Sequence, residues 1–311
     1  MAGFIGFHLA KQLKVLQQQV IGLDHFNDYY DVQLKRARAD KLAMLDISCI
    51  EGDICDGSLV ETLILDHGIT HIVHLAAQAG VRYSISHPES YIRNNLDGFV
   101  RVLEVCRKHP TIPFIYASSS SVYGLNQQQP FSESDSTDHP ASLYGATKKA
   151  NEVIAHAYHH LYGIPTTGLR FFTVYGPWGR PDMAYFTFTK NILEGRPISV
   201  YASHQMRRDF TYIDDIVIGI ISAIDKSYPC ELFNLGNHSP ENLQELIVLI
   251  EQALGKQAIQ QHLPMQAGDV PVTYADIAKS QTMLGFFPKT SLKEGIHRFV
   301  EWYLNDYSNL Q

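Results

Sequence analysis

The sequence contains little cysteine, and the spacing of its histidines does not indicate a metal centre. Its 311 residues include four scattered cysteines, Cys49, Cys55, Cys106 and Cys230. Because these show no paired or metal-ligand spacing, we expect free thiols in a reducing cytosol. His156 and His160 can share a helix face, but no third ligand accompanies them, so we predict no metal.

The sequence also lacks a long apolar run and an excess of positive charge. No run approaches the ~20 apolar residues that span a bilayer, and the N-terminus has no signal-peptide pattern. Lysine and arginine number 25 against 32 aspartates and glutamates, which gives a net charge of -7. This balance argues against non-specific binding of nucleic acid or anionic membranes. We therefore predict a cytoplasmic protein with no membrane and no nucleic-acid partner.

Among the features that are present, the stretch from Ser142 to Glu152 is the most informative, because it contains Tyr144 and Lys148. Residues four apart on a helix share a face, so both side chains can point into one site. At ~4 Å and an effective dielectric of ~20, the lysine charge stabilises a phenolate by about 4 kcal/mol. This lowers the ordinary tyrosine pKa of roughly 10 by about three units. The spacing predicts a phenol that transfers protons near working pH; a surface pair is the alternative.

A run of four serines, residues 118–121, follows an apolar segment that begins at Phe114. Open α/β sheets bind ligands at the carboxyl ends of their strands, where these hydroxyls are expected. With the tyrosine and lysine, they resemble the Ser-Tyr-Lys constellation of the extended short-chain dehydrogenase/reductase superfamily. The resemblance implies that Ser119, Tyr144 and Lys148 are catalytic. It also implies that Ser120 and Ser121, which follow Ser119, contact the substrate.

The first residues are similar to the end of a dinucleotide fingerprint. Gly3 and Gly6 precede an apolar-periodic stretch that ends at Leu16, as where such a fingerprint opens into its helix. The family pattern has a buried strand and a further glycine before them, and both are absent here. We interpret this as a start downstream of the natural one. The alternative is a truncated relative, which would be a non-catalytic nucleotide-sugar binder.

The acid at Asp24 ends a short apolar strand about 20 residues after these glycines. An acid at this position accepts the adenosine-ribose hydroxyls and repels the 2′-phosphate of NADP, so it favours NAD; a turn or cap role is the alternative. The resemblance implies further cofactor contacts at Gly3, Phe4, Ile5, Gly6, Asn27, Asp53, Ile54, Leu75, Ala76, Ala77, Gln78, Asn95, Tyr144 and Lys148.

Strand-like and helical patterns alternate as far as residue 173, and the alternation then breaks. We predict an α/β fold, a Rossmann-like doubly wound parallel sheet whose first strand is missing, with a smaller C-terminal substrate lobe. The expected NAD-binding domain covers residues 1–173 with a returning segment at about 212–236. The expected nucleotide-sugar lobe covers 174–211 and 237–311. The resemblance also implies a homodimer.

The run from Thr173 to Ala184, with residues 138–140 and 142–152, is most similar to UDP-glucuronate 4-epimerases. In the implied reaction, Tyr144 takes a proton from the carbon-4 hydroxyl of a UDP-sugar while hydride passes to NAD, and hydride then returns to the other face of the keto-sugar. Such a reaction would supply polysaccharide biosynthesis. The resemblance implies substrate contacts at Arg82, Ser120, Ser121, Thr173, Arg180, Arg208 and Asp269.

Arg208 is the expected diphosphate contact, because a guanidinium is always charged and forks onto phosphate oxygens. Two alternative reactions remain, those of a UDP-glucuronate decarboxylase and of another UDP-hexose 4-epimerase. A sugar 4,6-dehydratase is disfavoured, since such enzymes carry an Asp-Glu pair where this chain has residues 120–121. The sequence departs from the family at 201–205 and at Gly145, a helix former weaker than Ala by ~1 kcal/mol.

Overall fold

The computed structural model of the chain describes residues 1–201, 206–265 and 270–309. Residues 202–205, part of one departure from the family pattern, therefore lie outside it. The first half contains α1 (Phe4–Val15), β1 (Ile21–Asp24), α2 (Val32–Ala43), β2 (Ser48–Glu51), α3 (Gly57–His67), β3 (Ile72–His74), α4 (Tyr83–Ser86), α5 (Pro88–Tyr91), η1 (Ile92–Asp97), α6 (Gly98–Lys108), β4 (Phe114–Ser119), η2 (Ser120–Tyr123) and α7 (Leu143–Tyr162). The second half contains β5 (Thr166–Phe171), β6 (Thr173–Tyr175), α8 (Ala184–Leu193), β7 (Ile198–Tyr201), β8 (Arg207–Tyr212), α9 (Ile213–Lys226), β9 (Cys230–Leu235), β10 (Pro240–Asn242), α10 (Leu243–Leu254), β11 (Gln260–Leu263), α11 (Ala278–Leu284), α12 (Leu292–Asn305) and η3 (Tyr307–Asn309).

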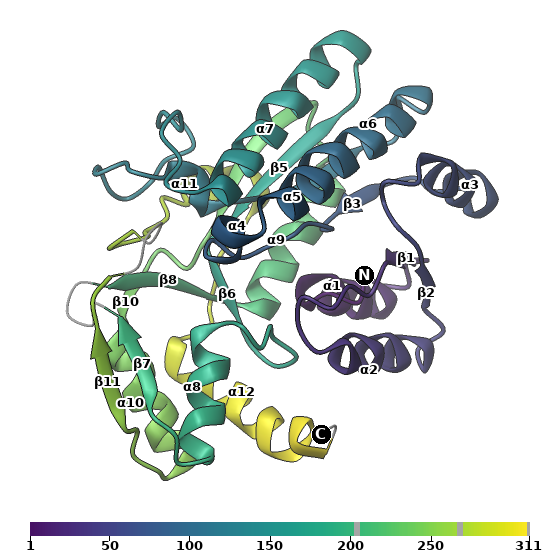
Figure 1. Cartoon of the computed structure of the whole chain (residues 1–311). Helices are drawn as coiled ribbons and strands as arrows, with labels where there is room; N and C mark the ends of the chain where they lie inside the picture. The colour runs from purple at the N-terminus through teal and green to yellow at the C-terminus, as the bar shows by residue number, and fades with distance from the viewer. Residues whose placement is uncertain (202–205, 266–269, 310–311) are drawn as a thin grey trace.

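The parallel strands form a sheet in two parts (Figure 1). One part pairs β1 with β2, and the other has the order β3-β4-β5-β9. Within the described ranges, no ladder joins β1 to β3. Every residue of β5 is buried, as expected for a parallel strand that is covered on both faces. The predicted α/β class and Rossmann-like parallel arrangement are confirmed.

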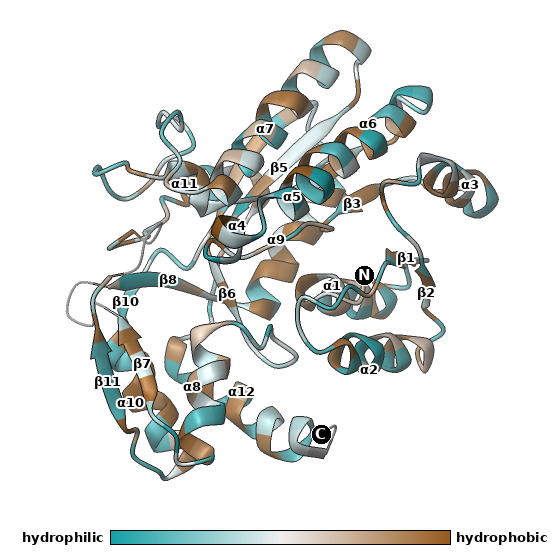
Figure 2. Cartoon of the chain, viewed as in Figure 1, coloured by the Kyte–Doolittle hydropathy of each residue, from teal (hydrophilic) through white to brown (hydrophobic). Residues whose placement is uncertain are grey.

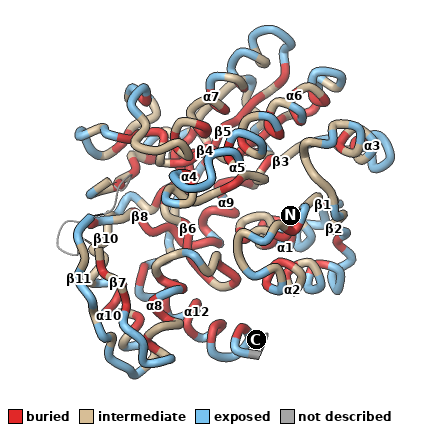
Figure 3. The backbone as a smooth tube through the Cα atoms, viewed as in Figure 1, coloured by how far each residue is buried: buried red, intermediate tan, exposed pale blue. Residues whose placement is uncertain are grey.

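Side chains along β4 alternate between two hydrophobic clusters. Phe114 and Tyr116 pack with Phe99 of α6 and Ala155 of α7. Ile115 belongs to the large cluster that also contains residues of α1 and α9. Because neighbouring strand residues point to opposite faces, helices cover both faces of this sheet. Figure 2 shows hydrophobic and hydrophilic residues alternating along these helices, and Figure 3 shows buried residues along β5 with exposed ones at the helix ends.

The helix α7 begins and ends at clear local signals. Ser142 accepts a hydrogen bond from the Gly145 amide at 3.1 Å, and Gly163 ends the helix with a φ of 71°. A Cβ at Gly145 would lie 2.5 Å from the carbonyl oxygen of Ser121. The glycine that departs from the family pattern therefore has a steric role, since it lets α7 approach the serine turn.

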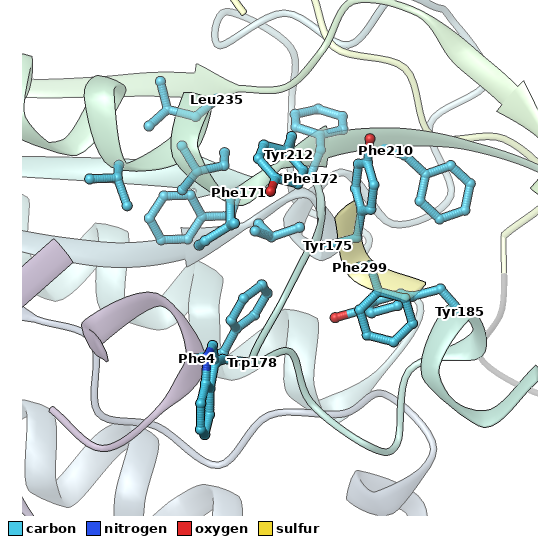
Figure 4. Packing of buried hydrophobic residues seen from close by; sticks show 14 of the residues in the cluster. Phe4, Phe171, Phe172, Tyr175, Trp178, Tyr185, Phe210, Tyr212, Leu235 and Phe299 are labelled. Carbon is cyan, nitrogen blue, oxygen red and sulfur yellow. The ribbon is translucent and has the colours of Figure 1, made fainter. Parts of the chain in front are cut away.

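The C-terminal elements build a second layer beside the parallel strands. β8 pairs in parallel with β6 and antiparallel with β10, and β7 pairs in parallel with β11. Aromatic rings join the helices below them, with Tyr185 and Phe186 of α8 against Phe299 of α12 at 4.7 and 5.6 Å (Figure 4). In the three described ranges, no helix is long and apolar enough to cross a membrane.

Candidate active site

A cavity of about 450 Å³ opens at the carboxyl ends of β1, β3 and β4. This edge of a parallel sheet is where open α/β folds bind ligands. The residues predicted from the sequence that line it are Gly3, Phe4, Ile5, Gly6, Asp24, Asn27, Ile54, Leu75, Ala76, Ala77, Gln78, Ser119, Ser120, Ser121, Tyr144, Lys148, Thr173, Arg180 and Arg208.

Three other predicted residues are not part of this lining, and Asp269 lies outside the described residues. Asp53 pairs with Arg93 at 2.5 Å at the surface. Asn95 is buried and holds the main chain of Gln78, accepting from its amide at 2.7 Å and donating to its carbonyl at 3.0 Å. Arg82 lies over the ring of Tyr201 at 4.9 Å. Asn95 thus supports the cavity wall, whereas the sequence predicts that it contacts the cofactor.

The predicted catalytic residues meet at one wall of the cavity. Ser119 ends β4; its Oγ donates to Ser121 Oγ at 3.2 Å, and its hydroxyl acts to lower the pKa of Tyr144 on α7. Lys148, one turn further along α7, donates from Nζ to the Ala117 carbonyl at 2.8 Å. Burial lowers the pKa of Lys148 to about 8. The hydroxyl, the phenol and the amine therefore lie where a single substrate hydroxyl can meet them.

The charge beside the phenol differs from the sequence-based expectation. Burial raises the pKa of Tyr144 above its ordinary value, although the Ser119 hydroxyl and the charge of Arg180 act to lower it, so the predicted lowering of this pKa is wrong. The sequence predicts that the Lys148 ammonium is the charge that lowers this pKa. Its ammonium is instead directed to the Ala117 carbonyl, which no helical spacing reveals.

A buried ion pair supports the serine run from below. Glu152 of α7 accepts from Arg170 Nε and Nη2, each at 2.8 Å, and from Ser118 Oγ at 2.6 Å. Arg170 also donates to Tyr123 Oη at 2.9 Å. A bidentate pair fixes both position and direction, so it holds α7 against β5 beside the serine run. Sequence reasoning missed this pair because its members are 18 residues apart on different elements.

Arg180 reaches the cavity from the loop after β6. Its Nε donates to Asp182 Oδ1 at 3.0 Å, and Tyr29 Oη donates to Asp182 Oδ2 at 3.0 Å. Burial and the Asp182 carboxylate raise the pKa of Tyr29 to about 12. Thr173 at the start of β6 lines the same cavity. An oriented guanidinium that lines the same cavity as the predicted catalytic phenol suits an anionic substrate.

The end of the cavity near α1 fits a dinucleotide. Gly3 precedes the first turn of α1, whose unpaired amides suit phosphate, and a Cβ at Gly3 would meet nothing within 4 Å. Burial acts to raise the pKa of Asp24, but the Met1 amine and the Phe26 amide outweigh it and leave the pKa below its ordinary value. Asp24 is therefore ionised, as ribose hydroxyls require of an acceptor. These residues fit NAD.

Sequence reasoning also missed Lys35, which lines the cavity from α2. Its Nζ donates to the Asn27 carbonyl at 2.6 Å, and burial lowers the pKa of Lys35 to about 8. The sequence signal that could have identified Lys35 is its position on α2, the helix that follows the strand ending at Asp24. The four cysteines are free thiols. Across the part of the chain that the structure describes, no group of three or more His, Cys, Asp or Glu can hold a metal ion.

Comparison with known proteins gives one family and several close relatives. The model of the NAD dependent epimerase/dehydratase family matches residues 1–236. UDP-glucuronate 4-epimerase 4 of Arabidopsis thaliana is 52% identical over 325 residues, which cover 99% of this chain and 74% of the relative. UDP-glucuronic acid 4-epimerase from Bacillus cereus, solved with UDP-glucuronic acid and NAD, has a TM-score of 0.91 and 36% identity, covering 97% of this chain and 96% of that chain. UDP-glucose 4-epimerase of Thermus thermophilus, solved with NAD, has a TM-score of 0.89 and 26% identity, covering 98% and 97%.

Proposed function

The chain belongs to the NAD dependent epimerase/dehydratase family, and from this premise we propose that it converts UDP-glucuronate into UDP-galacturonate. It is an NAD-dependent isomerase that acts at carbon 4 of a UDP-sugar. The choice of sugar is supported by the Arabidopsis relative and by the Bacillus cereus structure, which contains UDP-glucuronic acid.

The observation that carries the choice of sugar is the closeness of Arg180 to Tyr144. Both side chains line the same cavity, and the charge of Arg180 acts to lower the pKa of the phenol. In UDP-glucuronate the carboxylate is attached to carbon 5, next to the carbon whose hydroxyl must lose a proton. A cation beside the base therefore matches a uronate, whereas a neutral hexose offers it no charged partner.

Each side chain then has a defined task. Tyr144 takes the proton of the carbon-4 hydroxyl, and Ser119 holds the same oxygen by a hydrogen bond. The Arg180 charge and the Ser119 hydroxyl act to lower the pKa of Tyr144 and so favour its phenolate form. Lys148, whose Nζ donates to the Ala117 carbonyl, is the third proposed catalytic residue. Arg180 and Thr173 hold the carboxylate. NAD, when bound, accepts hydride from carbon 4 and returns it.

The remaining contacts hold the nucleotide in place while the sugar turns. Arg208 lines the cavity and is the proposed diphosphate contact, with its Nη1 directed to the Pro271 carbonyl at 3.0 Å. Ser120 and Ser121 line the cavity beside Ser119 and contact the sugar. We retain the division into an NAD-binding domain of 1–173 with 212–236, and a nucleotide-sugar lobe of 174–211 with 237–311, as part of this proposal.

The assembly and setting belong to the proposal as well. Val153 and Leu161 of α7 and Ile92 of η1 are 57%, 65% and 48% exposed, and such apolar side chains suit contact with a second copy. A homodimer is expected, and light scattering would measure it. The free thiols favour the cytoplasm, and a UDP-uronate is a donor for polysaccharide biosynthesis.

The experiment that tests the function is chromatography of nucleotide sugars after the purified protein is incubated with NAD and UDP-glucuronate. UDP-galacturonate is the expected product, and UDP-glucose is the control substrate. UDP-xylose would show a decarboxylase instead. Equal conversion of UDP-glucose would show a general hexose 4-epimerase, and binding without any product would show a nucleotide-sugar binder.

A further inference from the structure

Arg38 is a buried charge that holds two loops of the site together. It lies on α2 and is 0% exposed. Its Nη1 donates to the Ala2 carbonyl at 3.0 Å and to Tyr30 Oη at 2.7 Å. Its Nη2 donates to the carbonyls of Trp178 and Gly179 at 2.6 and 3.0 Å. All four acceptors are neutral oxygens, and within the described ranges Arg38 Nε has no hydrogen-bond partner.

Such a placement is costly if its purpose is stability alone. A charge that leaves water without meeting an opposite charge loses hydration that neutral acceptors replace incompletely. An apolar side chain of similar volume fills the same space without that cost. What a guanidinium adds is a planar fork with fixed donor directions, which sets where its acceptors lie. Arg38 therefore acts on the placement of main-chain segments.

The acceptors of Arg38 belong to segments that lead directly into the two binding regions. The Ala2 carbonyl precedes Gly3, which lines the cofactor end of the cavity. The Gly179 carbonyl precedes Arg180, which lines the sugar end. One guanidinium thus spans from the glycine loop to the peptide that carries the proposed carboxylate contact.

The turn before Arg180 is held in an uncommon conformation. Trp178 has a φ of 59°, in the left-handed region that bulky residues rarely adopt. Its ring packs on Phe7 of α1 at 5.4 Å and on Trp302 of α12 at 5.3 Å, and Figure 4 shows it beside Phe4. Such backbone persists when its surroundings fix it, so contacts with α1 and α2 determine this turn.

A second contact joins the same parts of the chain. His8 of α1 has its Nε2 at 2.9 Å from the Pro177 carbonyl. Burial lowers the pKa of His8 to about 3, so the imidazole is neutral and donates this hydrogen bond from Nε2. The first helix after the glycine loop is therefore bonded directly to the turn that precedes Arg180.

We propose that Arg38 is a positioning residue that couples the cofactor loop to Arg180, so that dinucleotide binding raises the affinity for UDP-glucuronate. The inference rests on the proposed function, because it takes Arg180 as the carboxylate contact. A dinucleotide that orders the peptide at Ala2 and Gly3 orders one side of the fork, and the other side fixes the peptide before Arg180. Linkage requires that UDP-glucuronate raises dinucleotide affinity by the same factor.

The test is a binding cycle measured by calorimetry on the full chain. UDP-glucuronate is titrated into the free protein and into protein loaded with NADH, which cannot oxidise the sugar. The wild type is expected to bind UDP-glucuronate about tenfold more tightly when loaded. Arg38→Lys, which keeps the charge but loses the fork, is expected to reduce that factor to about one. UDP-glucose, which has a hydroxymethyl group in place of the carboxylate, should bind the free and the NADH-loaded protein with the same affinity.

Controls separate positioning from folding and from the proposed function. Arg36→Gln removes an exposed arginine of the same helix that pairs with Glu51, and it should leave the coupling factor unchanged. If Arg38→Lys does not fold, His8→Leu supplies the same test and should lower the factor. A wild-type factor of one, or a full factor in folded Arg38→Lys, overturns the inference. Coupling without turnover would retain the inference while the epimerase proposal fails, and turnover without coupling would do the reverse.

Discussion

Among the residues that the structure describes, two arginines, Arg38 and Arg170, are almost fully buried, and their hydrogen-bond partners differ. Arg170, beside the four-stranded part of the sheet, meets the Glu152 carboxylate through two hydrogen bonds of 2.8 Å. Arg38, beside the two-stranded part, meets three carbonyls and a phenol. The paired charge bonds α7 to β5 and to Ser118 of β4. Arg38, which has no carboxylate partner among its hydrogen bonds, instead fixes the positions of main-chain segments that are distant in the sequence.

The largest effect should come from removing the phenol hydroxyl of Tyr144. Tyr144→Phe keeps the ring and its packing but removes the group that exchanges a proton with the sugar. We expect kcat to fall by about 10²–10⁴-fold, with both buried arginines and the melting temperature unaffected. Product chromatography measures the loss. Activity within threefold of wild type would contradict the catalytic role proposed for Tyr144.

The comparison itself is tested by removing each arginine in turn. Arg170→Met leaves the Glu152 carboxylate buried without its partner, which should cost about 3–5 kcal/mol of unfolding free energy. Arg38→Met leaves no carboxylate behind, so its loss should be clearly smaller. Denaturant unfolding measures both.

A double variant completes this test. In Arg170→Met with Glu152→Leu, no buried charge of the pair remains, and stability should return towards that of the wild type. Equal losses of unfolding free energy in Arg170→Met and Arg38→Met would contradict the distinction between an arginine paired with a carboxylate and one that positions main chain.

The third effect concerns the loop that Arg38 positions. Arg180→Met removes the proposed carboxylate contact, and a hydrogen bond to a charged group contributes about 1.5–3 kcal/mol. Binding of UDP-glucuronate should weaken by roughly 10- to 100-fold. Calorimetry with UDP-glucose as the matched ligand isolates the carboxylate, since the affinity for UDP-glucose should stay within twofold. Parallel losses for both ligands would contradict the assignment.

The last effect is a dependence of stability on pH in the Arg38 region. Burial lowers the pKa of His8 to about 3, from an ordinary value of 6.5. Below pH 6.5 the unfolded chain gains a proton that the folded protein excludes, so stability falls as the pH drops from 6.5 towards 3. His8→Leu should lose less melting temperature over this range than the wild type. The exposed His156→Leu is the control and should follow the wild type.

Local spacing allowed much of the site to be predicted. Tyr144 and Lys148 share a helix face, and both line the cavity with Ser119 and the glycines of the first loop. Each of these features lies within one element or one turn. The α/β class followed in the same way from alternating patterns along the chain.

Contacts between distant segments escaped prediction. Arg38 bonds to residues 36 and 141 positions away, and no sequence period marks such partners. The direction of the Lys148 ammonium depends on a carbonyl 31 residues earlier. Asn95 was predicted to contact the cofactor, yet its amide is used to hold Gln78. Electrostatics in a buried site depend on burial and on these non-local partners, which is why both the predicted direction and the predicted cause of the Tyr144 pKa shift were wrong.

The close contact at Gly145 has a consequence for how the enzyme tolerates change. The approach of α7 to the Ser121 carbonyl leaves no room for a Cβ. The separation between the Tyr144 phenol and the serine turn is therefore set by direct contact between the main chain at Gly145 and the Ser121 carbonyl. Rotamer changes in the surrounding side chains do not alter that separation. Substitutions at Ser120 or Thr173 can reshape the sugar pocket while the spacing of the proton-transfer groups stays fixed.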